Sequence, residues 1–189
     1  MVKPDSLFWV LYFYCHLLFA ASPEQQLAVG DWVFRQGTSA ESYLISNFGN
    51  GQFSHIGIVI ETEPKIRILH ATTNDSPQYP NQVIVSSWDE FTVPKLALNY
   101  AVARANFLTP AQQQHISQLV QQQLGQPFVL AARHKPHLYC TTIIADAVQA
   151  VSSDASFEWS YLDQPLLRGD YLHPDAFAQQ NVQWIVPPP

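Results

Sequence analysis

The sequence predicts an α+β fold in which a mainly antiparallel sheet packs against helices. Segments rich in β-branched residues and bounded by turn formers indicate strands at residues 53–61, 66–72, 82–86 and 99–104. Two segments with helical periodicity follow, at residues 109–125 and 140–151. Strands that precede and surround two helices are typical of the α+β class. There is no internal repeat, and we expect one domain over residues 22–189.

Turn formers set the order of the elements in the first half of the chain. Val29-Gly30-Asp31 is a turn that leads into a strand at residues 32–35, and residues 39–46 have the composition of a short helix. Glu63-Pro64-Lys65 separates the strands on either side of it. This short turn predicts that those two strands form a hairpin.

The helix predicted at residues 109–125 has clear signals at both ends. Thr109 is a suitable N-cap, Pro110 fits the first helical position and Gln112 completes a capping box. Gly125 suits the C-terminal stop. The spacing predicts a buried stripe made of Ile116, Leu119, Val120 and Leu124. After residue 154 we expect an irregular tail with one short helix at residues 174–178.

Composition excludes some partners. The chain carries a net charge of −6 and no basic run, which argues against nucleic acid as a partner. Charged residues make up only 13% of the chain, whereas 47% are hydrophobic, enough for a single core. Aromatic residues are spread along the whole chain, which is not the composition of a disordered protein.

The first residues have the anatomy of a secretory signal peptide, which we place at residues 1–21. Lys3 precedes an apolar run at residues 7–19, and the small residues Ala20-Ala21-Ser22 suit cleavage. We therefore expect a periplasmic or secreted protein, with N-terminal membrane association if the segment is not cleaved. Cleavage removes Cys15, so Cys140 becomes the one thiol of the mature domain.

Cys140 stands at the start of a helix whose apolar stripe is Ile143, Ile144, Ala147, Val148 and Val151. Backbone N–H groups at a helix start have no partner within the helix, and the helix dipole favours an anion there. A thiol in this position ionises more easily and becomes a nucleophile. The same N–H groups can hold an oxyanion. The alternative is that Cys140 is a small buried hydrophobe that happens to begin a helix.

A cysteine nucleophile needs a base and a group that orients the base. His55 opens one strand of the predicted hairpin and His70 ends the other, so both lie toward the same open end. Adjacent strand positions bring side chains within about 5 Å, which suits a base held by an orienting residue. The alternative is two unrelated histidines at strand ends. His115 faces solvent by helical phase.

His134, His137 and Cys140 offer a competing pattern, because all three are zinc-ligand types at short spacing. The pattern lacks a fourth ligand, and Pro136 interrupts any helical phase. We expect no metal and no cofactor. There is also no G-x-S-x-G elbow, Walker motif or dinucleotide glycine pattern.

Four motifs in order resemble the YiiX/YebB-like permuted papain-fold amidases and peptidases, relatives of the NlpC-type peptidoglycan hydrolases and of the lecithin retinol acyltransferases. The motifs are Gly30-Asp31-Trp32-Val33-Phe34, Phe53-Ser54-His55-Ile56-Gly57-Ile58-Val59, Leu69-His70-Ala71 and Leu138-Tyr139-Cys140. The resemblance extends from about Val29 to Phe177. It implies a circularly permuted papain-like fold, in which the base precedes the nucleophile along the chain.

By this resemblance Cys140 is the nucleophile, His55 the general base and His70 the third member of the triad. Family members often place Glu where His70 stands, and Thr141-Thr142 replaces a Ser-plus-acidic pair. The implied function is cleavage of an amide, with peptidoglycan peptide as the expected substrate, through an acyl-enzyme. A lipid-like acyl substrate and a non-catalytic envelope binding module are the alternatives. We expect Tyr139 to line the pocket, and the aromatic residues Trp32, Phe53 and Trp88 to surround it.

Overall fold

The structure is a computed structural model, which describes residues 23–48, 51–164 and 167–189. The predicted signal peptide at residues 1–21 lies outside the described residues. Among the helices that are described, none is long and apolar enough to cross a membrane.

A six-stranded antiparallel sheet forms the centre of the domain, as the sequence predicts. Its strand order is β4-β3-β2-β1-β5-β8, and each neighbouring pair is antiparallel. The strands are β1 (Trp32–Gly37), β2 (His55–Glu61), β3 (Arg67–Thr72), β4 (Gln82–Ser87), β5 (Ala97–Ala105) and β8 (Val182–Val186). A separate hairpin is formed by β6 (Trp159–Gln164) and β7 (Leu167–Leu172).

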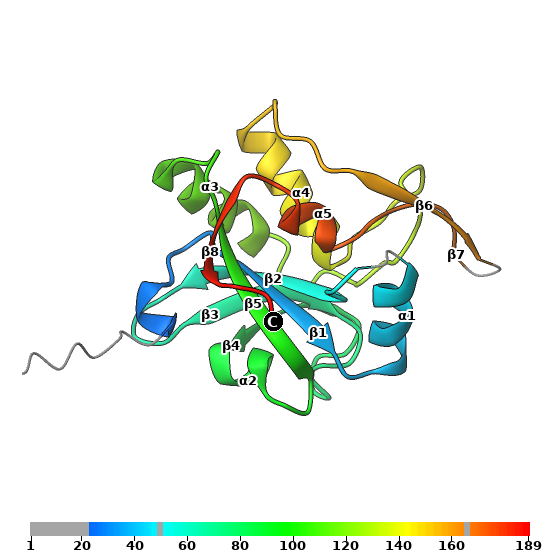
Figure 1. Ribbon diagram of the computed structural model, residues 1–189, viewed down its shortest axis with the longest axis horizontal. Helices are drawn as coiled ribbons and strands as arrows, with labels where there is room; N and C mark the ends of the chain where they lie inside the picture. The colour runs from blue at the N-terminus through cyan, green and yellow to red at the C-terminus, as the bar shows by residue number, and fades with distance from the viewer. Residues whose placement is uncertain (1–22, 49–50, 165–166) are drawn as a thin grey trace, which may run out of the picture.

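Helices cover both faces of the sheet (Figure 1). Helices α3, α4 and α5 lie over one face, and the short helix α2 lies under the other. The helical elements are η1 (Pro23–Gln26), α1 (Ala40–Phe48), α2 (Trp88–Thr92), α3 (Pro110–Gln121), α4 (Cys140–Val151) and α5 (Asp175–Ala178). The arrangement confirms the predicted α+β class, with the helix of Cys140 packed on the sheet.

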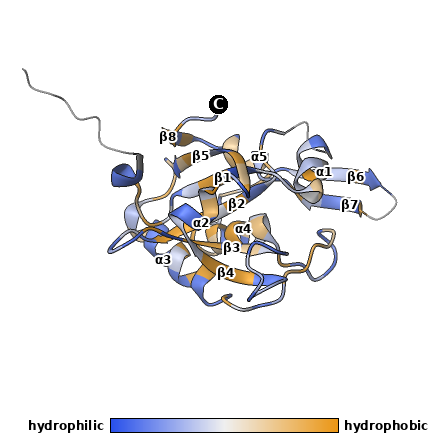
Figure 2. Ribbon diagram, turned by 90° about the horizontal axis from the view of Figure 1, so that it is seen from below, coloured by the Kyte–Doolittle hydropathy of each residue, from blue (hydrophilic) through white to orange (hydrophobic). Residues whose placement is uncertain are grey.

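The two faces of the sheet carry separate hydrophobic clusters because side chains alternate along each strand. Ile56 and Leu69 face α3 and α4 in the larger cluster. Val59 and Ile68 face the opposite way and pack with Phe91 of α2. Figure 2 shows hydrophobic residues concentrated on β1 to β4 and on α4. Both faces of the sheet are thus buried, which fixes the register of its strands.

Helix α3 confirms the predicted N-terminus and corrects the predicted end. The hydroxyl of Thr109 accepts a hydrogen bond from the Gln112 backbone, and the Gln112 side chain accepts one from the Thr109 N–H. The helix ends at Gln121 and a series of turns continues to Gly125, whose φ of +79° suits glycine. Leu124 therefore leaves the buried stripe and is 55% exposed.

The prediction of an irregular tail after residue 154 is wrong. The tail forms the β6–β7 hairpin and strand β8, and only the short helix at 175–178 is as expected. The hairpin was missed because polar and charged residues interrupt its apolar ones. Strand β8 was missed because its stability comes from pairing with the edge of β5, a contact distant in sequence.

Candidate active site

Cys140 is the first residue of α4, as the helical periodicity predicts. Ile143, Ile144, Ala147 and Val148 of the same helix are buried against the sheet. Helix α4 contacts strands β2 and β3, the two strands that carry the candidate histidines. Packing of the apolar stripe therefore sets the distance of the thiol from the sheet.

Hydroxyl groups fix the first turn of α4. The Thr142 hydroxyl accepts a hydrogen bond from the Tyr139 N–H at 2.9 Å and donates to the Tyr139 carbonyl at 3.2 Å. The Thr141 hydroxyl donates to the Leu172 carbonyl at 2.8 Å, and the Tyr139 phenol accepts from the Leu172 N–H at 2.9 Å. Both neighbours of Cys140 in the chain are thereby bound to the end of β7.

The Cys140 thiol is buried, with 9% of the residue exposed. Burial raises its pKa to about 11, while backbone N–H groups of Ile56, Thr141 and Cys140 itself act in the opposite direction. The resting cysteine is therefore a neutral thiol that needs a base. The contact with Ile56 places the sulfur beside β2, one residue from His55. Among the described residues, no hydrogen bond joins the thiol to an imidazole.

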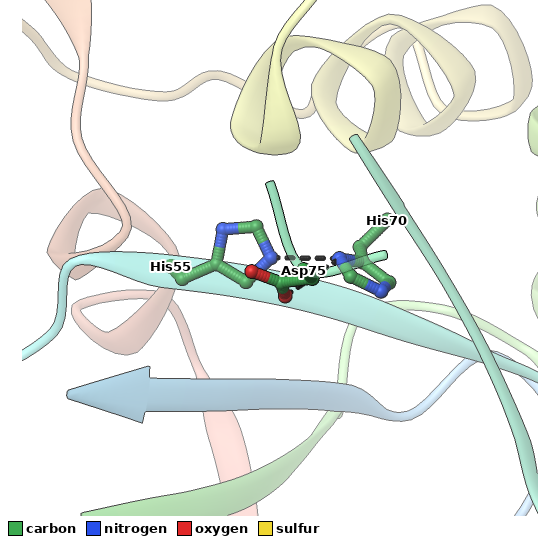
Figure 3. A group of neighbouring side chains, drawn as sticks. All are labelled: His55, His70 and Asp75. Atoms are coloured by element: carbon green, nitrogen blue, oxygen red, sulfur yellow. Dashed lines mark hydrogen bonds and ion pairs between the residues drawn. The ribbon is translucent and has the colours of Figure 1, made fainter. Parts of the chain in front are cut away.

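His55 and His70 meet at the open end of the β2–β3 hairpin, as predicted. His55 Nε2 lies 2.9 Å from His70 Nδ1 (Figure 3). On its other side, His70 Nε2 lies 3.0 Å from the Ser86 hydroxyl on β4. Phe91 stacks on the His55 ring and meets the His70 ring edge to face. The two rings are held by three strands and one aromatic side chain.

One arrangement of protons along the hydrogen-bond chain leaves a free base nitrogen on His55. If His70 Nε2–H donates to Ser86, then His70 Nδ1 is an acceptor, and His55 Nε2–H donates to it. The remaining nitrogen, His55 Nδ1, then carries a free lone pair. This tautomer makes His55 a base, with His70 as its orienting residue.

Both imidazoles are neutral at pH 7. Burial lowers the pKa of His55 well below its ordinary value, and the charge of Arg35 lowers it further. Burial also lowers the pKa of His70 to about 3. The nearby carboxylate of Asp75 acts in the opposite direction on both rings and will stabilise an imidazolium when one forms.

Asp75 and Arg35 are site residues that the sequence analysis missed. Arg35 Nη2 lies 2.7 Å from Asp75 Oδ2, and the same oxygen lies 3.8 Å from His70 Nδ1. Burial alone would raise the pKa of Asp75, but its electrostatic interactions with His55, Arg35 and His70, together with the Arg35 hydrogen bond, lower it to about 2. Asp75 gave no signal because it stands among turn formers. Arg35 was detectable as a lone charge in an apolar strand.

In the described part of the chain, one group of side chains could hold a metal ion. It consists of His55, His70 and Asp75. Their ligand atoms lie within 4.8 Å of one another. Two contacts oppose a cation there: the Arg35 guanidinium occupies the Asp75 oxygen, and the two ring nitrogens bond to each other. The other pattern of zinc-ligand types, His134, His137 and Cys140, does not form such a group among the described residues. His137 Nδ1 instead contacts the Lys135 carbonyl at 2.8 Å.

A cleft of about 610 Å³, including its open mouth, begins at Cys140. Tyr139 lines it, as predicted, together with residues of the β6–β7 hairpin. The three aromatic residues expected around it lie elsewhere. Trp32 and Phe53 are buried in the main core, and Trp88, the first residue of α2, packs on the opposite face of the sheet. These aromatic residues belong to the hydrophobic core and not to the cleft, because helices cover both faces of the sheet.

Comparison with known proteins decides the family. The family model described as permuted papain-like amidase enzyme, YaeF/YiiX, C92 family, matches residues 26–165, well over half of the chain. The chain belongs to this family. This C92 protein is thus an enzyme of the papain-like amidase type, which confirms the resemblance found in the sequence. No protein with a curated description matches the sequence.

A solved structure supports the fold of this C92 amidase. The crystal structure of metalloprotein yiiX from Escherichia coli O157:H7 is similar with a TM-score of 0.68, at 19% sequence identity. The match covers 84% of this chain and 96% of that one. At this identity the likeness concerns the fold alone.

Proposed function

We propose that this C92 amidase cleaves an amide through a thioester on Cys140, with His55 as the base and His70 as the orienting residue. The observation that carries the proposal is the hydrogen-bond chain from His55 through His70 to Ser86, beside the helix start that carries Cys140. With His70 Nε2–H donating to Ser86, the chain supplies a base for a thiol that is protonated at rest.

In the acylation step, His55 Nδ1 takes the thiol proton and the sulfur attacks the amide carbonyl carbon. Negative charge moves to the carbonyl oxygen, where the Cys140 backbone N–H can stabilise it. The imidazolium then gives its proton to the departing nitrogen. The C–N bond breaks, the amine leaves and a C–S thioester remains.

In the deacylation step, water replaces the amine. His55 takes a proton from the water, whose oxygen attacks the thioester carbonyl carbon. The C–S bond breaks, the acid product leaves and the proton returns to the sulfur. Asp75 is close enough to stabilise the transient imidazolium in both steps.

We further propose that the enzyme works in the cell envelope, because residues 1–21 have the anatomy of a secretory signal. Two substrate classes fit that compartment. One is cell-wall peptide, which the resemblance to peptidoglycan hydrolases favours. The other is an amide or ester of a lipid-like acyl group, which the hydrophobic side chains of the cleft favour.

The test is incubation of cell-envelope material with the purified protein, followed by mass spectrometry of both muropeptides and lipids. We expect new products with the parent protein and none with Cys140→Ala. Cys15→Ala, which removes the other cysteine of the chain, is the matched control and should retain every product. Absence of any Cys140-dependent product would contradict the proposal and favour a binding module.

A further inference from the structure

We propose that Arg35 is a positioning residue that keeps the base nitrogen of His55 free of a proton. It acts through Asp75, whose carboxylate it holds away from His70. The inference rests on the proposed function, because it concerns the same base. It extends that function by naming the residue that selects the proton arrangement on which the base depends.

The hydrogen-bond chain can carry its protons in two arrangements. In the first, His70 Nε2–H donates to Ser86 and His55 Nε2–H donates to His70 Nδ1, which leaves His55 Nδ1 free. In the second, the Ser86 hydroxyl donates to His70 Nε2 and His70 Nδ1–H donates to His55 Nε2. Every hydrogen bond of the chain is made in both, but in the second the proton of His55 lies on Nδ1. Only the first arrangement therefore leaves a base for the thiol.

The carboxylate of Asp75 favours the second arrangement. Its Oδ2 lies 3.8 Å from His70 Nδ1, too far for a hydrogen bond but close enough for its charge to attract a proton to that nitrogen. The Asp75 side chain is only 8% exposed, so salt and water screen this attraction weakly. Without a counter-charge, the carboxylate would draw the shared proton onto His70 and leave the proton of His55 on Nδ1.

Arg35 opposes this attraction by its position and by its charge. Its Nη2 lies 2.7 Å from the same Asp75 oxygen, so the carboxylate is bound to the guanidinium and not to the imidazole. The opposite charges of the pair cancel most of the field that would move the proton. After burial, the charge of Arg35 has the largest effect on the pKa of His55 and lowers it, whereas Asp75 acts in the opposite direction. The cation thus outweighs the carboxylate at the base.

Three features fix the guanidinium beside the base. Arg35 is the Cα partner of His55 in the pairing of β1 with β2. Its Nη1 donates to the Phe91 carbonyl at 3.2 Å, and the guanidinium carbon lies 4.8 Å from the centre of the Phe91 ring. The same ring stacks on His55. One strand pair and one aromatic side chain therefore hold the cation and the base at a constant separation.

Stability alone is a weak reason for the ion pair. Replacing a buried ion pair with hydrophobic residues is often neutral or stabilising. Arg35 also keeps its Nε–H buried without a hydrogen-bond partner among the described residues, which is a further cost. The charge that the pair places beside the imidazoles is the better explanation.

The first test reads the protons directly. Long-range ¹H–¹⁵N NMR of the ¹⁵N-labelled full-length protein distinguishes a protonated ring nitrogen from an unprotonated one. In the parent we expect an unprotonated Nδ1 and a protonated Nε2 on both His55 and His70. Arg35→Gln keeps a donor for Asp75 but removes the charge, and it should reverse both rings. His115, exposed on α3, should not change.

Three further variants separate charge from structure. Arg35→Lys keeps the cation and should keep the parent arrangement. Arg104→Gln is the matched control, because it removes the arginine of another ion pair of the sheet, with Asp31 at 2.7 Å, and should leave both imidazoles unchanged. Arg35→Gln combined with Asp75→Asn removes both charges and should move the rings back toward the parent arrangement.

The second test measures the effect on the thiol through alkylation of Cys140 by iodoacetamide at pH 7. Arg35→Gln should slow alkylation by about tenfold or more, as loss of the base itself does. Arg35→Lys and Arg104→Gln should stay close to the parent rate. Arg35→Gln with Asp75→Asn should recover part of the loss.

Two results would overturn the inference: a parent spectrum with a proton on His55 Nδ1, or an Arg35→Gln spectrum in which neither ring changes. The parent spectrum needs no variant, so the test holds even if Arg35→Gln does not fold. Cys140-dependent products from cell-envelope material, together with imidazoles that do not respond to Arg35→Gln, would contradict only the role of Arg35. The expected spectra without any such product would contradict only the proposed catalysis.

Discussion

Arg35 and Asp75 form a buried ion pair of 2.7 Å beside the two imidazoles of the site. Arg35 is also held by the Phe91 carbonyl at 3.2 Å and lies over the Phe91 ring. These contacts hold the Asp75 carboxylate close to His70, and the opposite charge of Arg35 keeps the net charge of the pair at zero. It connects the loop after β3 to strand β1 and to helix α2.

Asp75→Asn should reduce both stability and turnover. It leaves the Arg35 charge buried without its partner, which costs about 3 kcal/mol in the free energy of unfolding. It also removes the carboxylate that stabilises the imidazolium, so kcat should fall by about tenfold or more. Urea unfolding and steady-state kinetics measure the two effects.

The double variant Arg35→Met with Asp75→Leu separates these effects. Replacing both charges with hydrophobic groups should restore most of the stability, since no unpaired charge remains. Activity should stay low. Recovery of full activity in the double variant would show that Asp75 acts only through the fold.

Stability should fall as the pH falls from about 7 to 4. The pKa of His70 is about 3 in the folded protein and near 6.5 when unfolded, so the unfolded chain binds more protons between these values. The stability is fully present above the unfolded pKa and is lost as the pH falls toward the folded one. At about 1.4 kcal/mol per pKa unit, the loss by pH 4 is on the order of 3 kcal/mol.

Thermal unfolding at a series of pH values measures this loss. His70→Gln should be less stable at pH 7 and should show a shallower dependence on pH. His115→Gln, on the exposed side of α3, is the matched control and should follow the parent. A parent protein whose melting temperature does not change between pH 7 and 4 would contradict the assignment of two neutral buried rings.

Alkylation of Cys140 should be slow at neutral pH and should accelerate well above the pH at which an ordinary cysteine titrates. Burial raises the pKa of the thiol to about 11, so the rate with iodoacetamide should still be rising at pH 10. His55→Ala should slow alkylation at pH 7 by about tenfold or more, because the general base is lost. An ordinary thiol pKa that is unchanged in His55→Ala would favour the binding module.

Metal removal should not affect turnover. Arg35 occupies the Asp75 oxygen that a cation would need, and the imidazole nitrogens bond to each other. The rate should be the same before and after treatment with EDTA, and elemental analysis should find less than one zinc per chain. A loss of activity on chelation that zinc restores would place a metal on these three residues.

Local patterns in the sequence were enough to predict the positions of the three residues of the proposed triad. Cys140 begins its helix because the apolar stripe behind it has a helical period, and Thr142 stabilises the turn before it. His55 and His70 meet because a short turn sets the register of one hairpin. Contacts between neighbouring strands and within one helix follow directly from periodicity.

The residues that the sequence did not reveal depend on contacts between distant segments. Asp75 reaches the site because its loop folds back on Arg35, which lies 40 positions earlier in the chain. The hydrophobic wall of the cleft comes from a hairpin whose strands mix leucines with charged residues, as at Asp163 and Arg168. Such strands give no apolar run, and their role appears only once Leu172 is bound beside Cys140.

The order of the site along the chain has a consequence for assembly. His55 and His70 are 15 positions apart and meet by closing one short loop, which costs little chain entropy. Cys140 joins them only after a much longer loop closes and α4 docks on the sheet. The contact between the two histidines needs no residue beyond β4, so it can form without Cys140. The thiol therefore acquires its base only when α4 docks on the sheet, and a chain that ends before Cys140 carries no active centre.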